Sequence, residues 1–157
     1  MKKRKMPKFY NFSFGVTSAI MTSLAVVIGL SGATNNITII TALLIIAIAD
    51  NISDSFGIHI YQESKCINPK EVKTTTTNNF IARMLITFVF ILFVIYMPIN
   101  LSIIFSIIFG ITILTVLSYL ISKSQKISPY YSIIRHLTIA IILMVSSFIL
   151  KYIILKI

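Results

Sequence analysis

Two aspartates stand inside a long apolar stretch of the sequence, in the segment AIADNISDSFGIH at residues 47–59. A carboxylate in membrane hydrocarbon is costly, so such residues usually mark a functional site. At about 100° per residue, Asp50 and Asp54 lie about 40° apart on one helix face, which Gly57 and Tyr61 continue. Like charges this close would not both ionise in a dry site unless a cation lay between them. The pair indicates either a site that exchanges metal ions for protons or a polar pair that holds helices together.

A second polar stripe lies in the preceding apolar segment, FSFGVTSAIMTSLAVVIGLSGA. Ser18 and Thr22 are four residues apart, which puts them on one helix face with Met21 beside them. Carboxylate oxygens suit Mg²⁺, Mn²⁺ or Fe²⁺, and a neighbouring thioether would favour softer metals. Ala25 and Gly29 extend the face with small residues, which let helices approach closely. The stripe therefore predicts either metal ligands or a packing surface.

The elements that would position these residues are membrane-spanning helices. Of the 157 residues, 57% are hydrophobic and only 11% are charged, whereas a soluble domain carries roughly a quarter charged residues. Several apolar runs reach the roughly 20 residues that span a bilayer. The single cysteine, Cys66, excludes an internal disulfide. We predict an all-α integral membrane protein with a single membrane domain over residues 1–157.

The apolar runs predict five transmembrane helices, at about 12–33, 38–61, 80–97, 99–122 and 131–154. A basic N-terminal segment at residues 1–11 precedes the first helix, and a short polar connection at 62–79 separates the second from the third. Pro98 and Pro129 stand where the fourth and fifth helices begin, and proline is tolerated in a first helical turn.

The basic residues sort to one side of these five helices. Twelve of the fourteen lie in the N-terminal segment, in and beside the second connection, or in and beside the fourth; the other two are Lys151 and Lys156. Arg83 is counted here as a flanking residue at the start of the third helix. Cytoplasmic loops carry an excess of lysine and arginine. We therefore predict a cytoplasmic N-terminus and a C-terminus outside.

Two stretches of the sequence together resemble the signature of a known family. They are FGVTSAIMTSLAVVIGLSGA at residues 14–33 and AIADNISDSFGIHIYQESK at residues 47–65. The first resembles the first-helix signature of the vacuolar iron transporter family, which reads like G-x-S-D-G and ends in G-L-S-G-A. The second resembles the family's A-I-S-M-x-L-G-E-Y, with Ile52, Ser53 and Gly57 in register. The resemblance covers roughly the first 65 residues, and the later helices agree in number and spacing. It implies five spans with a cytoplasmic N-terminus.

Several positions depart from the family pattern. The family's first-helix metal-site Asp falls on Ser18, its second-helix Met falls on Asp54, and its following Glu falls on Ile58. Asp50 falls where the family usually has a small residue. By this comparison the carboxylate has moved from the first helix to the second. The glutamate-rich cytoplasmic domain that many members carry is replaced by the short 62–79 connection.

The resemblance implies a homodimer that exports Fe²⁺ or Mn²⁺ from the cytosol in exchange for protons, and we expect it in the plasma membrane of a prokaryote. In this hypothesis Asp50 and Asp54 bind the ion, and Ser18, Met21 and Thr22 complete the metal site from the first helix. The alternative is a non-transporting membrane scaffold or interaction protein of the same fold, in which the aspartates fix packing or bind a partner. No nucleophile–base constellation or metal-hydrolase spacing occurs in the sequence. We therefore expect no enzyme activity, no resident cofactor and no nucleic-acid partner.

Overall fold

The computed structural model describes residues 10–32 and 35–156, and this part of the chain consists of helices joined by short turns, without a strand. The helices are α1 (Tyr10–Gly29), α2 (Asn36–Ile45), the π-helix η1 (Ile46–Asp50), α3 (Asn51–Ser64), α4 (Pro69–Tyr96), α5 (Ile99–Gln125) and α6 (Pro129–Ile154). Because α2, η1 and α3 follow one another without a break, the described residues form five helical rods, each long and apolar enough to cross a membrane. The predicted all-α fold with five spans is confirmed. Of the basic segment predicted at residues 1–11, residues 1–9 lie outside the described residues, and the last two belong to the first turn of α1.

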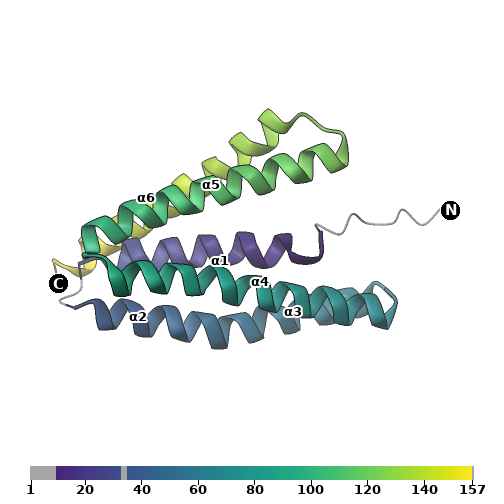
Figure 1. Ribbon diagram of the computed structural model, residues 1–157, viewed down its shortest axis with the longest axis horizontal. Helices are drawn as coiled ribbons and strands as arrows, with labels where there is room; N and C mark the ends of the chain where they lie inside the picture. Colours follow the sequence, from purple (N-terminus) through teal and green to yellow (C-terminus); the bar gives the residue numbers. More distant parts are fainter. Residues whose placement is uncertain (1–9, 33–34, 157) are drawn as a thin grey trace.

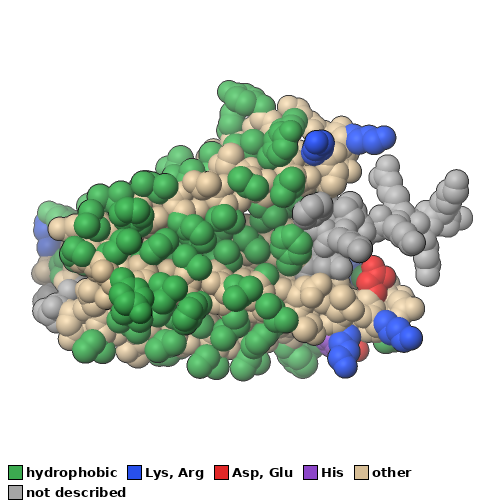
Figure 2. All heavy atoms as spheres, viewed as in Figure 1, with side chains coloured by type: hydrophobic (Ala, Val, Ile, Leu, Met, Phe, Trp, Pro, Cys, Tyr) green, Lys and Arg blue, Asp and Glu red, His purple; other side chains and the backbone are tan. Residues whose placement is uncertain are grey.

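The rods alternate in direction along the long axis of the molecule. α1 begins at the end that also carries the α3–α4 and α5–α6 turns, whereas α6 ends at the opposite end (Figure 1). Hydrophobic side chains cover the middle of the visible face, and charged side chains gather toward its two ends (Figure 2). This is the distribution that a bilayer favours, because its hydrocarbon accepts apolar side chains and its interfaces accept charged ones.

The hydrophobic core is built around α1. This helix packs most extensively on α4 and also contacts α5 and α6. Ile20 and Leu24 of α1 are fully buried and pack in one cluster with Phe90 of α4 and Leu114 of α5.

α1 and α4 approach each other closely at Gly15. Its backbone N–H donates a hydrogen bond to Asn79 Oδ1 at 2.7 Å, and a Cβ at this position would collide with the backbone carbonyl oxygen of Asn79. Small residues let membrane helices approach in this way. This contact sets the register that brings Ser18, one turn further along α1, level with Arg83 of α4.

The polar connection between the second and third spans is much shorter than the predicted 62–79. α3 continues to Ser64 and α4 begins at Pro69. Asn68 caps α4 by accepting a hydrogen bond from the Lys70 backbone N–H at 3.0 Å, and proline suits the first helical position. Local capping thus extends the helix through a polar segment that composition alone assigned to a loop.

The π-turn in the second span coincides with an unusual spacing of its buried residues. Ile39, Leu43, Ala47, Asn51 and Ser55 are all buried and all four residues apart. Because an α-helix has 3.6 residues per turn, a four-residue spacing drifts around the helix by about 40° per step. The wider turn at η1 offsets part of this drift and keeps these residues facing α4.

Candidate functional site

The centre of the candidate site is Arg83. It lies near the middle of α4, and its side chain is only 2% exposed. Its Nη2 donates to Asp50 Oδ2 and its Nη1 donates to Asp54 Oδ2. The cation that two neighbouring carboxylates require is thus supplied by the protein itself. The sequence-based assignment of Arg83 to the helix flank was wrong, and eleven basic residues remain on the side predicted to be cytoplasmic.

Ser18 joins the site from α1. Its hydroxyl accepts a hydrogen bond from Arg83 Nη1 at 2.5 Å and donates one to Asp54 Oδ2 at 3.0 Å. Three rods therefore meet at one polar cluster, which we call the Arg83 cluster and which consists of Ser18, Asp50, Asp54 and Arg83. The structure brings together three of the five residues expected at a metal site, and their role as metal ligands stays a prediction.

The other two expected ligands are engaged elsewhere. The Thr22 hydroxyl donates to the carbonyl oxygens of Ser18 and Ala19 within its own helix, at 3.0 and 3.3 Å. Met21 is partly buried and packs against the hydrophobic core. The Met21 contact corresponds to the packing alternative for the α1 stripe, and the role of both residues as metal ligands stays a prediction.

A hydrogen bond from a buried amide fixes the second span against α4 beside the cluster, and a second bond within α3 orients that amide. Asn51 Nδ2 donates to the Phe80 carbonyl oxygen at 3.0 Å, and the Ser55 hydroxyl donates to Asn51 Oδ1 at 3.4 Å. Asp50 is the last residue of η1, and π-turns occur frequently at functional sites. The carboxylates are therefore positioned by a turn and a buried amide rather than by the α-helical period alone.

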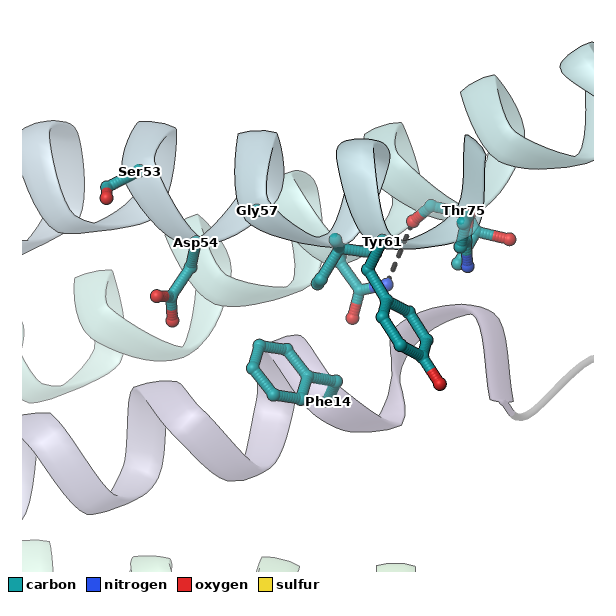
Figure 3. Close-up of a pocket in the computed structure, with 9 residues that line it drawn as sticks. Phe14, Ser53, Asp54, Gly57, Tyr61 and Thr75 are labelled. Carbon is teal, nitrogen blue, oxygen red and sulfur yellow. Dashed lines mark hydrogen bonds between the residues drawn. The ribbon is translucent and has the colours of Figure 1, made fainter. Parts of the chain in front are cut away.

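A cleft of about 620 Å³ leads to the cluster along the half of α3 that ends at the turn to α4. Its polar lining comes from Ser53, Asp54, Tyr61, Gln62, Thr75 and Asn79. Figure 3 shows Asp54 extending from α3 toward α1, where Phe14 lies beside it, while Ser53 points away. The Asp50 and Asp54 side chains are 40% and 33% exposed, in contrast to the buried Arg83. The carboxylates are thus the accessible part of the cluster, with the guanidinium behind them.

The sequence contains a pattern that indicates a buried position for Arg83, although the count of basic residues assigned it to the helix flank. Thr75, Asn79, Arg83 and Thr87 are four residues apart and all are buried on one face of α4. A polar stripe at this spacing inside an apolar helix indicates an interior face. In the described part of the chain no three His, Cys, Asp or Glu side chains gather as a metal cage. An ion at this site would therefore complete its coordination with hydroxyl, amide or water oxygens.

Comparison of the chain with models of known protein families, with curated proteins and with solved structures finds no match. The resemblance to vacuolar iron transporters therefore stays a prediction from the two quoted stretches.

Proposed function

We propose that this protein exchanges a divalent metal ion, Fe²⁺ or Mn²⁺, for protons across a membrane, exporting the metal from the cytosol. The observation that carries the proposal is the convergence of Asp50 and Asp54 on one cationic group in the middle of a membrane-spanning bundle. Two carboxylates with this geometry can hold one metal ion or take up protons in its place, which is the chemistry that antiport needs.

Access to the carboxylates supports this function. The cleft reaches Asp54 from one end of the molecule and is lined by amide, hydroxyl and carboxylate oxygens. Such oxygens can replace water around a hard cation as it loses its hydration shell. A site used only for packing would need no such approach.

The second candidate function is a non-transporting scaffold. It is favoured by the internal ion pairs, since Arg83 already neutralises part of the charge on Asp50 and Asp54 and ties α4 to the second span. In this case the Arg83 cluster stabilises the bundle and carries no ion.

Flux of Mn²⁺ into proteoliposomes under a pH gradient separates the two functions. Antiport predicts uptake by the wild type that falls at least tenfold in Asp50→Asn and in Asp54→Asn, because an amide is a poorer ligand than a carboxylate and exchanges no proton. Glu71→Gln is the matched control, since it removes a carboxylate from the first turn of α4, away from the cluster. Wild-type flux that survives both cluster substitutions would remove these aspartates from the mechanism. Absence of wild-type flux would favour the scaffold.

A further inference from the structure

Arg83 occupies the place between the carboxylates that the transported ion would take. Its Nη atoms contact the Oδ2 atoms of Asp50 and Asp54. A guanidinium presents its N–H donors in a fixed fork that matches carboxylate oxygens. A metal ion bound by the same two oxygens would lie close to the guanidinium, and the two positive charges would repel each other.

We propose that Arg83 is a tethered competitor of the transported ion, holding Asp50 and Asp54 while the ion is absent and withdrawing when the ion binds. This inference rests on the proposed function and deepens it, because it names the residue that sets the affinity of the site. Arg83 would keep the empty carboxylates charge-paired inside the membrane and would raise the concentration of ion needed to fill the site.

The hydrogen bonding of Arg83 supports withdrawal. An arginine that serves only to hold helices together is expected to hydrogen-bond through all of its guanidinium N–H groups, because an unsatisfied buried donor costs free energy. Arg83 Nε is buried and has no hydrogen-bond partner among the described residues. In the described part of the chain the guanidinium donates hydrogen bonds through its two Nη atoms only, and the partners of these atoms are Ser18, Asp50 and Asp54 of the cluster.

The direction of access supports competition. The cleft ends at Asp54, whose side chain is one-third exposed, whereas Arg83 is buried on the far side. An arriving ion therefore meets the carboxylate before it meets the guanidinium. A divalent ion attracts the carboxylates more strongly than a monovalent ion at the same distance, since the Coulomb energy scales with charge. Competition with Arg83 thus favours divalent over monovalent cations.

The test measures Mn²⁺ binding to the full-length protein in detergent by titration calorimetry at constant pH, with Mn²⁺ flux measured in parallel. The variants are Arg83→Gln, which removes the competitor, and Arg83→Lys, which keeps the charge but cannot span both carboxylates with one ammonium. Arg135→Gln is the matched control, because it removes the same charge from an exposed position on α6. We expect Arg83→Gln to bind Mn²⁺ at least tenfold more tightly than the wild type and Arg83→Lys to bind it a few-fold more tightly. The control should match the wild type.

The outcomes separate this inference from the proposed function. Equal or weaker Mn²⁺ binding by folded Arg83→Gln overturns the competition, and the proposed function survives if the wild type carries Mn²⁺. Should Arg83→Gln fail to fold, Arg83→Lys decides in the same way, because its retained charge still balances the carboxylates. Tighter binding by an Arg83 variant beside a wild type that carries no Mn²⁺ supports the competition and overturns transport. Absence of binding by all of these proteins overturns both proposals.

Discussion

At Arg83, Asp50 and Asp54, two carboxylates share one guanidinium inside a membrane-spanning bundle. The cost of unpairing a buried charge exceeds the gain from forming the pair, because the unpaired group has lost its water. The consequence of a substitution thus depends on which partner is removed. Asp54→Asn leaves one carboxylate paired with Arg83, whereas Arg83→Gln leaves two carboxylates facing each other.

The two substitutions should therefore differ in stability. We expect Arg83→Gln to lower the free energy of unfolding by about 1–3 kcal/mol, a value reduced from that of fully buried pairs because the carboxylates are partly exposed. Asp54→Asn should cost less than about 1 kcal/mol, since a neutral amide is easier to bury than a carboxylate. Denaturant unfolding in detergent micelles, followed by circular dichroism, measures both. Equal losses would show that the charge balance of the Arg83 cluster does not govern stability.

The helices reach this arrangement through close packing of α1 on α4. Gly15 has the Asn79 backbone directly against it, whereas Gly57 on α3 has no atom within 4 Å of a Cβ placed there. The same substitution should have opposite effects at these two positions, because one site is filled and the other is open.

We expect Gly15→Ala to destabilise the protein by about 1–3 kcal/mol, as overpacking generally does, because the obstacle is rigid backbone. Gly57→Ala should be neutral or stabilising by up to about 1 kcal/mol, because alanine favours the helix more than glycine does. Thermal unfolding of the two variants beside the wild type provides the comparison. A harmless Gly15→Ala would mean that α1 and α4 lie further apart than the structure places them.

Across the whole molecule, the charge distribution predicts how the bundle sits in the membrane. With Arg83 removed from the count, six basic residues of the described chain lie in or beside the α3–α4 and α5–α6 turns, against Lys151 and Lys156 at the other end, and the sequence adds five more at residues 2–8, ahead of α1. The bias keeps its direction, and the start of α1 and the end of α6 lie at opposite ends of the molecule (Figure 1).

A reporter fused to the C-terminus should therefore read as external, and one inserted in the turn at Cys66 should read as cytoplasmic. Accessibility of the two reporters to a membrane-impermeant reagent in intact cells measures this. Labelling of both positions from the same side would contradict the crossing number.

The accessible carboxylates also bear on assembly. The side chains of Asp50 and Asp54 retain 40% and 33% exposure at membrane depth, and a carboxylate facing lipid is costly. We expect a homodimer in which a second copy shields this face of the second span from lipid, while the cleft beside α3 leaves Asp54 within reach of an ion.

Cysteine cross-linking tests the homodimer in a Cys66→Ser background. Ser53→Cys, exposed on α3, should form a cross-linked dimer in native membranes, whereas Val145→Cys, exposed on α6, should not. Comparable cross-linking at both positions would indicate random collision rather than a defined interface.

The five spans could be predicted from the sequence alone, because a backbone in lipid must satisfy its hydrogen bonds within each helix, so the length and hydropathy of each apolar run suffice. The sequence also identified Ser18, Asp50 and Asp54 as candidate members of one polar site, since intramembrane polar residues one turn apart share a helix face. The place of Arg83 between the two carboxylates became visible only in the folded bundle. Whether a basic residue near a helix start faces water or the interior depends on where capping at Asn68 begins the helix. It depends also on partners 29, 33 and 65 residues away along the chain, and no local pattern encodes those contacts.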